Sequence, residues 1–334
     1  MLPNLPPEPA ATPVPAGAPA PEWRAWTAAA ALPAPLQPVS DPRLARAGVS
    51  LWLKRDDLIH PVVSGNKWRK LLPNLRAAHA AGQRRLLTFG GAYSHHLTAV
   101  AAAAAATGFA SVGLVRGDEL ADAPRNPALA RAERDGMTLA FLSRADYRRT
   151  LRELTEPATT RRLTERFGPA YLLPEGGSNA LAARGAAELV TELAGQLPDL
   201  GPGDVVCCPV GSGGTLAGIA AALPPGAQAL GVAVLRGGAG YLEAEITALH
   251  RAGWPGRTFD RWSVDHAHHG GGYGRIPAEL AAFTDRFEAE HGLRLERRYV
   301  AKAVSCLYHR ALRGDFPHGT RLTAVITGAP SDHD

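Results

Sequence analysis

Lysine is scarce in this chain, which makes the few lysines candidates for chemistry. Among 36 residues of Lys or Arg, lysine occurs only as Lys54, Lys67, Lys70 and Lys302, so arginine fills nearly every ordinary surface position. A lysine that persists supplies a property that arginine lacks, a primary amine that can lose its proton and form an imine. Chance retention is the alternative for any single lysine.

Lys67 has the local sequence that suits such an amine best. It belongs to the stretch Ser-Gly-Asn-Lys-Trp-Arg-Lys at 64–70, in which a helix is expected to begin near Asn66. Lys67 then lies in the first helical turn, where the amide dipoles disfavour an ammonium group and lower its pKa. The alternative is a solvated helix start with three basic residues.

A second polar stretch, Gly-Gly-Ala-Tyr-Ser-His-His at 90–96, lies between an expected strand and an expected helix. Backbone amides at such a turn can bind a carboxylate, and the Ser94 hydroxyl is available for proton transfer. Tyr93, Ser94 and His95 are therefore candidate substrate-binding residues. Tyr93 and the histidines could instead be turn and packing residues, and His96 is better explained in that way.

A glycine-rich loop follows an apolar strand and precedes a helix, and its members are Gly211, Ser212, Gly213, Gly214 and Thr215. Closely spaced glycines leave amides free to bind a phosphate, and the two hydroxyls add donors. The loop does not match the dinucleotide fingerprint and lacks the lysine of a nucleoside-triphosphate loop. A phosphate loop without that lysine, in a chain whose imine-capable lysine lies elsewhere, indicates pyridoxal phosphate (PLP).

Strand and helix signals alternate around these three stretches, which predicts a predominantly parallel α/β protein. Strands are expected at 51–54, 85–89, 111–115, 138–142, 171–173, 205–210, 229–234 and 323–326. Helices are expected from 66 onward, at 97–106, 146–167, 180–197 and 216–223. Residues 1–31 are rich in Pro and Ala without any period, which favours a disordered or loosely docked extension.

Bulk properties exclude several classes of protein. The formal charge of +5 comes mostly from scattered arginines, so no nucleic-acid surface is expected. No apolar run is long enough to span a bilayer, and the N-terminus lacks the features of a secretory signal. Cys207, Cys208 and Cys306 form an odd set without metal-ligand spacing, so no metal site is expected and a reducing cytoplasm is favoured.

Taken in order, these stretches resemble the D-cysteine desulfhydrase and 1-aminocyclopropane-1-carboxylate (ACC) deaminase family. This family belongs to the tryptophan-synthase-β-like, type II PLP enzymes. The resemblance runs from about 32 to 329 and rests on 51–57, 64–70, 90–94, 174–179, 211–215, 271–274, Tyr299 with Lys302, and 327–328.

The resemblance implies a role for each matched residue. Lys67 would form the Schiff base with PLP and return as the proton carrier at Cα. Asn66 and His95 would contact the cofactor, the 211–215 loop would bind its phosphate, and Thr327 would meet the pyridine nitrogen. A neutral hydroxyl at that nitrogen makes a weak electron sink, which suits β-elimination.

For the substrate, the resemblance implies that Ser94 lies beside the carboxylate and the reacting carbon. Tyr273 and Tyr299 would approach from the opposite lobe. ACC deaminases have a Glu directly after the second tyrosine, whereas this chain has Val300, which argues against ring opening. The chain also has His95 where the family usually has Asn, Ala301 where it has Gly, and Ala329 where it has Gly.

The resulting prediction is a type II fold with two parallel-sheet α/β lobes and PLP in the cleft between them. The large PLP-binding domain would comprise 32–69 and 173–334, and the small substrate domain 70–172. The predicted reaction is α,β-elimination from a small amino acid, with D-cysteine giving pyruvate, ammonia and sulfide, in a cytoplasmic homodimer. The alternatives are ACC deamination, a specialised biosynthetic lyase or racemase, a catalytically silent PLP-binding regulator and a nucleotide-binding module.

Overall fold

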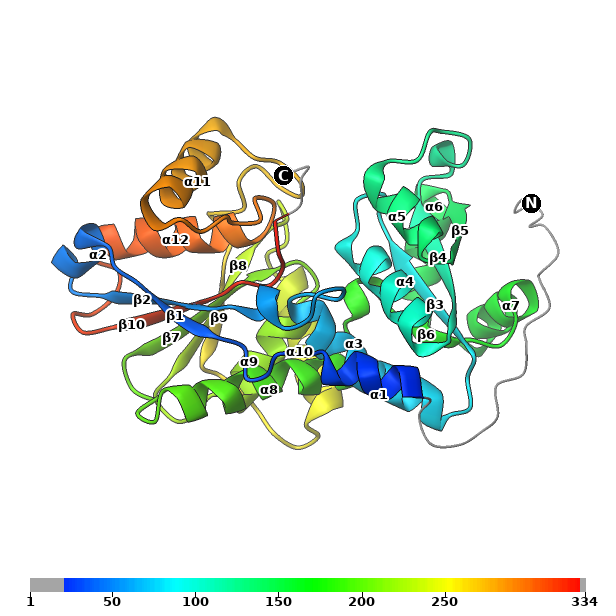
Figure 1. The fold of residues 1–334 in the computed structure, drawn as a ribbon, viewed down its shortest axis with the longest axis horizontal. Coiled ribbons are helices and arrows are strands. Elements are labelled where there is room, and N and C mark those ends of the chain that lie inside the picture. The colour runs from blue at the N-terminus through cyan, green and yellow to red at the C-terminus, as the bar shows by residue number, and fades with distance from the viewer. Residues whose placement is uncertain (1–20, 331–334) are drawn as a thin grey trace. The chain divides into compact units, whose positions relative to one another are not determined.

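The chain forms two compact units in the computed structural model, which describes residues 21–330 (Figure 1). The described part of the smaller unit comprises 21–29 and 75–175, and that of the larger unit comprises 30–74 and 176–330. The chain therefore passes between the units after Asn74 and after Glu175, whereas the sequence placed the lobe boundaries at 69/70 and 172/173. The chain passes between the units within α3 (Asn66–Ala80), one residue after Pro73.

The larger unit is built on a six-stranded sheet with the order β1-β2-β10-β7-β8-β9. Only β1 pairs antiparallel, with β2, and the remaining neighbours are parallel. The strands are β1 (Leu36–Val39), β2 (Ser50–Lys54), β7 (Asp204–Val210), β8 (Gln228–Ala233), β9 (Trp262–Asp265) and β10 (Arg321–Val325).

Helices cover both faces of this sheet because alternate strand residues point to opposite faces (Figure 1). Cys207 packs in a cluster with α12, whereas Val206 and Cys208 pack in a second cluster with α8 and α9. The helices of this unit are α2 (Pro42–Arg46), the first half of α3 (Asn66–Ala80), α8 (Ala180–Gln196), α9 (Gly214–Ala222), α10 (Tyr241–Gly253), α11 (Ala278–His291) and α12 (Val300–Leu312), with short 3-10 turns at Asp56–Leu58 and Glu175–Gly177.

The smaller unit contains a fully parallel four-stranded sheet with the order β5-β4-β3-β6. Its strands are β3 (Arg85–Gly90), β4 (Ala110–Arg116), β5 (Met137–Leu142) and β6 (Tyr171–Leu173). Its helices are α1 (Pro21–Ala28), α4 (His95–Thr107), α5 (Pro127–Arg134), α6 (Arg144–Arg152) and α7 (Pro157–Phe167), with a 3-10 turn at Asp118–Leu120. Two sheets of this kind confirm the predicted α/β class.

The predicted disordered extension is wrong for its last residues. Pro21–Ala28 is helical, and Trp23 and Trp26 on it are buried. The Trp23 ring lies 5.8 Å from that of His79 and 6.4 Å from that of Phe109, measured between centroids. Two buried indoles stabilise a short helix that its own sequence does not favour. Residues 1–20, the rest of the predicted extension, lie outside the described residues.

The stretch 146–167, expected to be one helix, is two helices. Pro157 starts α7 because proline is tolerated in the first turn but not in a helix interior. The helices α2, α5, α10, α11 and α12 and the strands β1 and β9 have no counterpart among the predicted elements. Within residues 21–330, no helix combines the length and the apolar character that crossing a bilayer requires.

Candidate active site

The candidate cofactor residues of the larger unit gather at one edge of its sheet. Strands β2, β10, β7, β8 and β9 run parallel, so their carboxyl ends share an edge. In open parallel sheets this edge is where ligands bind. The segments that follow these strands at this edge include 55–66, 211–215, 266–273 and Thr327. They contain or directly precede most of the predicted cofactor residues.

The start of α3 is held against the end of β10 by a close backbone contact. The amide of Asn66 donates to the carbonyl oxygen of Thr327 over 3.0 Å. Gly65 has a φ of +69°, and a Cβ there would lie 1.9 Å from the same oxygen. Glycine is therefore required for this approach, which fixes the first turn of α3 beside Thr327.

Lys67 is connected to the glycine-rich loop through Asn66. The Lys67 Nζ donates to Asn66 Oδ1 over 2.8 Å, and Asn66 Nδ2 donates to Thr215 Oγ1 over 2.9 Å. Asn66 and Thr215 are buried, whereas Lys67 keeps part of its surface accessible. The structure thus brings the amine and the loop, which are far apart in sequence, to one place.

Burial lowers the pKa of Lys67 to about 8, and the attraction of Glu296 opposes this shift. The sequence predicted the direction but attributed it to the helix dipole, whereas desolvation is the largest cause. With a pKa near 8, roughly a tenth of the amine is neutral at pH 7, against well under a thousandth for an ordinary lysine. Such an amine can act as a nucleophile without a separate base.

The glycine-rich loop is closely surrounded by polar side chains. Ser212 Oγ lies 2.7 Å from Ser178 Oγ, and Lys70 Nζ donates to Ser178 Oγ over 3.0 Å. A Cβ on Gly214 would lie 2.7 Å from Ser178 Oγ and 3.1 Å from Lys70 Nζ. Since the first amides of α9 have no carbonyl partner within their own helix, the loop presents donors and a cation that fit a phosphate.

Sequence reasoning missed Lys70 as a member of this group. Burial lowers the pKa of Lys70 to about 7, and repulsion from Lys67 adds to the effect. A bound dianion would restore its charge, because an opposite charge within a few ångströms favours the ammonium form. The signal was present, since Lys70 is one of the four lysines that an arginine-rich chain retains.

Tyr273 and Tyr299 are neighbours at the same edge of the sheet. Their ring centroids are 5.9 Å apart and their planes meet at 77°. Tyr299 Cε1 lies 3.7 Å from the position that a Cβ on Gly211 would occupy. Burial and the proximity of Tyr273 raise the pKa of Tyr299 well above its ordinary value. Tyr299 is therefore a neutral phenol at physiological pH and can donate a proton.

A buried carboxylate that was not predicted positions Tyr299. Glu296 accepts hydrogen bonds from the backbone amides of Arg298, Tyr299 and Val300 over 2.8, 2.8 and 3.1 Å. A carboxylate at the start of a helix satisfies amides that the helix cannot and complements its dipole. Glu296 thus fixes the beginning of α12, where Tyr299 is the N-cap residue.

In the smaller unit, Ser94 caps α4. Its Oγ accepts from the amide of Leu97 over 3.4 Å, and a Cβ on Gly90 would lie 2.7 Å from that oxygen. His95 is the first residue of α4 and is partly exposed, and Tyr93 before the cap is exposed. All three candidate substrate residues therefore lie around one helix start.

His96 is buried, and its Nε2 lies 2.8 Å from Thr88 Oγ1 on β3. The buried contact supports the packing role that the sequence favoured for His96. His95 and His96, although adjacent, therefore have different surroundings.

We expect Gly214→Ala to weaken PLP binding by about tenfold or more, because the added methyl group would displace Ser178 Oγ and Lys70 Nζ. Spectroscopic titration of the apoenzyme with PLP measures the effect. Gly195→Ala is the matched control, since Gly195 is a helical glycine of the same unit with open space around its Cβ position. Equal PLP affinity in the two variants would argue against the loop as the phosphate site.

Comparison with known proteins agrees with this geometry. The pyridoxal-phosphate dependent enzyme family matches residues 29–328. A D-cysteine desulfhydrase of Klebsiella pneumoniae is 34% identical over 233 residues, which cover 66% of this chain and 67% of that protein. A putative ACC deaminase of Thermotoga maritima is 36% identical over 177 residues, which cover 53% of this chain and 54% of that protein.

A solved structure shows the same fold. The crystal structure of an ACC deaminase homologue superimposes with a TM-score of 0.76 at 24% identity and covers 92% of this chain and 94% of that one. The predicted type II fold is thereby confirmed. The chain belongs to the pyridoxal-phosphate dependent enzymes, in the group that includes the D-cysteine desulfhydrases and ACC deaminases.

Proposed function

We propose that this enzyme catalyses α,β-elimination from a small amino acid, with D-cysteine as the preferred substrate and pyruvate, ammonia and sulfide as products. PLP, when bound, withdraws electrons from the substrate Cα and so makes its proton acidic. The observation that supports the proposal best is the Lys67 amine, whose pKa is lowered to about 8 and which Asn66 links to the glycine-rich loop.

Each residue has a role in this proposal. Lys67 holds the cofactor and, as a free amine, accepts the Cα proton. The loop 211–215 together with Lys70 binds the phosphate, and Asn66 and His95 contact the ring substituents. Thr327, buried at the end of β10, offers a neutral hydroxyl to the pyridine nitrogen.

The substrate roles extend the same proposal. Ser94 and its neighbours Tyr93 and His95 bind the carboxylate at the start of α4. Tyr299, a neutral phenol next to Tyr273, donates a proton to the leaving sulfur. In this assignment the larger unit supplies Lys67, the phosphate loop and Tyr299, whereas the smaller unit supplies the residues that bind the substrate carboxylate.

The surroundings of Val300 favour elimination over ring opening. The residue that follows Tyr299 is Val300, which is 1% exposed and packs in the apolar cluster of α12. The nearby carboxylate of Glu296 already accepts three amide hydrogen bonds at the start of α12. The relatives named as ACC deaminases keep ring opening as the second candidate.

A panel of substrates tests the proposal. Purified holoenzyme is assayed with D-cysteine, L-cysteine, D-serine and ACC, and keto acid and ammonia are measured. We expect kcat/KM for D-cysteine to exceed that for ACC by about 100-fold or more, a difference of roughly 3 kcal/mol in transition-state binding. Faster turnover of ACC would favour the second candidate, and turnover of none of them would favour a silent regulator.

The proposal also includes a cytoplasmic homodimer. Cys207, Cys208 and Cys306 are all buried and unpaired with one another, as expected for a protein of a reducing compartment. The homodimer rests on the family resemblance alone.

A further inference from the structure

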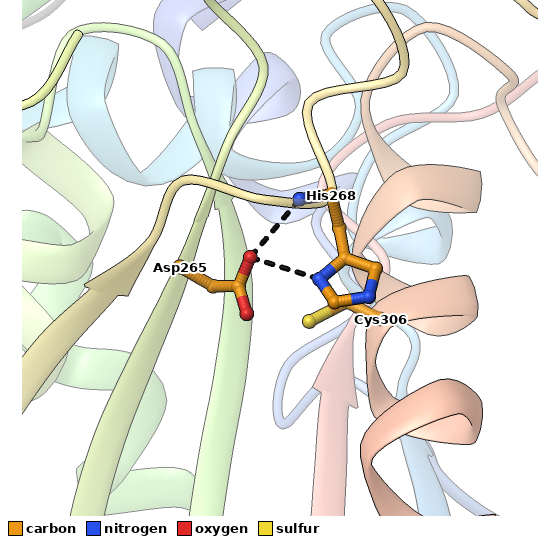
Figure 2. A group of neighbouring side chains, drawn as sticks. All are labelled: Asp265, His268 and Cys306. Carbon is orange, nitrogen blue, oxygen red and sulfur yellow. Dashed lines mark hydrogen bonds and ion pairs between the residues drawn. The ribbon is translucent and has the colours of Figure 1, made fainter.

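Three side chains of different chemistry converge in the larger unit outside the candidate cofactor site. Asp265 ends β9, His268 lies in the loop that follows, and Cys306 projects from α12 (Figure 2). Their ligand atoms all lie within 4.8 Å of one another. We infer that Asp265, His268 and Cys306 form a binding site for Zn²⁺.

The backbone fixes two of these ligands before any metal binds. Asp265 Oδ1 accepts from the amides of Ala267 and His268 over 2.9 and 3.0 Å, so the loop after β9 turns tightly around the carboxylate. The same oxygen lies 2.9 Å from His268 Nδ1 (Figure 2). This turn aims the imidazole at the carboxylate.

The distances suit a small tetrahedral ion. Zn²⁺ binds sulfur at about 2.3 Å and nitrogen or oxygen at about 2.0 Å, which puts neighbouring ligand atoms roughly 3.3–3.8 Å apart. The three ligand atoms lie between 2.9 and 4.8 Å from one another, so each would have to move by about 1 Å or less to reach these distances. One oxygen, one nitrogen and one sulfur ligand favour Zn²⁺ over Mg²⁺ or Ca²⁺, which prefer oxygen alone.

The protons balance in a simple way. Burial raises the pKa of the Cys306 thiol, and the carboxylate of Asp265 raises it further, so the thiol is protonated without metal. Zn²⁺ replaces that proton, which leaves to solvent. Binding through Nδ1 of His268 requires the tautomer whose ring proton is on Nε2.

The other charged groups around the site are compatible with a cation. Arg310 Nη1 lies 4.0 Å from Asp265 Oδ2, but Arg310 Nε is closer to Asp315, at 3.5 Å, and can stay there. His309 lies three residues after Cys306 on α12, and its ring centroid is 5.5 Å from that of His268. His309 is therefore a candidate for a fourth ligand.

A second group of similar composition, Asp41, Glu290 and His291, is not a comparable site. Arg43 Nη2 contacts Asp41 Oδ2 and Glu290 Oε2, each over 2.5 Å, and the Tyr308 hydroxyl donates to Asp41 over 2.9 Å. A guanidinium group already occupies the position that a metal would need. This group therefore serves as an internal comparison.

The metal would have a structural effect on the candidate active site. It would join β9 to α12, and the loop that begins at His266 continues to Tyr273, while α12 begins directly after Tyr299. The sequence predicted no metal site, because Cys207, Cys208 and Cys306 do not have metal-ligand spacing relative to one another. The spacings Asp-x-x-His and Cys-x-x-His, which occur at 265–268 and 306–309, become informative once the fold brings the two segments together.

Cobalt substitution tests the site in the holoenzyme. Protein purified with a chelator and then dialysed is titrated with Co²⁺, and bound metal is counted by elemental analysis. We expect one Co²⁺ per chain, with a near-ultraviolet thiolate-to-cobalt band and visible bands of tetrahedral intensity that Zn²⁺ displaces. Absence of stoichiometric metal, or binding without a thiolate band, would overturn the proposal.

Variants assign the ligands. Cys306→Ser should abolish the thiolate band, and Asp265→Asn and His268→Gln should each weaken Co²⁺ binding by about 100-fold. Asp265→Asn keeps the oxygen that accepts from Ala267 and His268, so the loop is retained if circular dichroism is unchanged. His291→Gln, in the comparison group, should leave Co²⁺ binding unchanged. Full binding by folded His268→Gln would refute the assignment.

Discussion

Lys67→Ala is expected to remove the visible absorbance of bound PLP and to lower turnover by at least about 10³-fold. The variant lacks the amine whose pKa is lowered to about 8 by burial and which would join the cofactor to the protein. Absorbance of the purified variant after incubation with PLP, together with assays on the best substrate, measures both effects. Alanine also leaves Asn66 Oδ1 without the Nζ donor.

Two matched variants separate the imine from charge and packing. Lys67→Arg keeps a cation but cannot form the imine, so it should be as inactive as Lys67→Ala. Lys70→Gln should keep the visible band but weaken PLP binding by about tenfold, because it removes a cation from the donors that would bind the phosphate. Reduction of the wild-type holoenzyme with borohydride should label a single lysine.

Peptide mapping then decides the assignment, since the chain has only four lysines. A label on Lys70 or Lys302, or a visible band that persists in Lys67→Ala, would show that another amine holds the cofactor. A wild-type protein that stays colourless with PLP would exclude the proposed enzyme altogether.

The sequence predicted residues whose chemistry is evident from their near neighbours. A lysine that follows Ser-Gly-Asn, and a glycine-rich loop between strand and helix, can be interpreted without knowing the fold. Lys67 and the loop 211–215 are indeed linked, through Asn66. The parallel sheets followed from the same alternation of strand and helix signals.

What the sequence could not predict depends on partners far along the chain. Ser178 meets Ser212, and Lys70 joins them, only because α3, α9 and the loop before α8 converge. Glu296 is three residues from Tyr299, but its role depends on where α12 begins. The helix α1 depends on burial of Trp23 and Trp26, which a Pro- and Ala-rich stretch does not reveal.

The same limit applies to a buried ionic network that positions the first turns of α3. Arg69 Nε and Nη2 donate to the two oxygens of Asp56, each over 2.8 Å, and Arg69 Nη1 donates to Glu192 over 2.8 Å. Lys54 Nζ donates to the same Glu192 over 2.7 Å. Burial raises the pKa of Glu192, but the contacts with Arg69 and Lys54 outweigh burial and lower it.

Arg69→Met should lower the free energy of unfolding by about 3–5 kcal/mol, the largest effect on stability that we expect from a single substitution here. Methionine fills much of the same space but leaves the buried carboxylate of Asp56 and the partly buried carboxylate of Glu192 without their guanidinium partner. Urea unfolding of the holoenzyme, followed by circular dichroism, measures the change.

The exposed pair of Arg144 and Glu119 provides the control, since Arg144→Ala should leave the free energy of unfolding nearly unchanged. Adding Asp56→Asn to Arg69→Met should recover part of the loss, because it removes the carboxylate that Arg69→Met leaves without an ion-pair partner, whereas Glu192 keeps Lys54. Stability of Arg69→Met within 1 kcal/mol of wild type, or no recovery in the double variant, would contradict this account. Because Lys67 is two residues from Arg69 on α3, the stability lost by Arg69→Met should also appear as weaker retention of PLP, which the visible band reports.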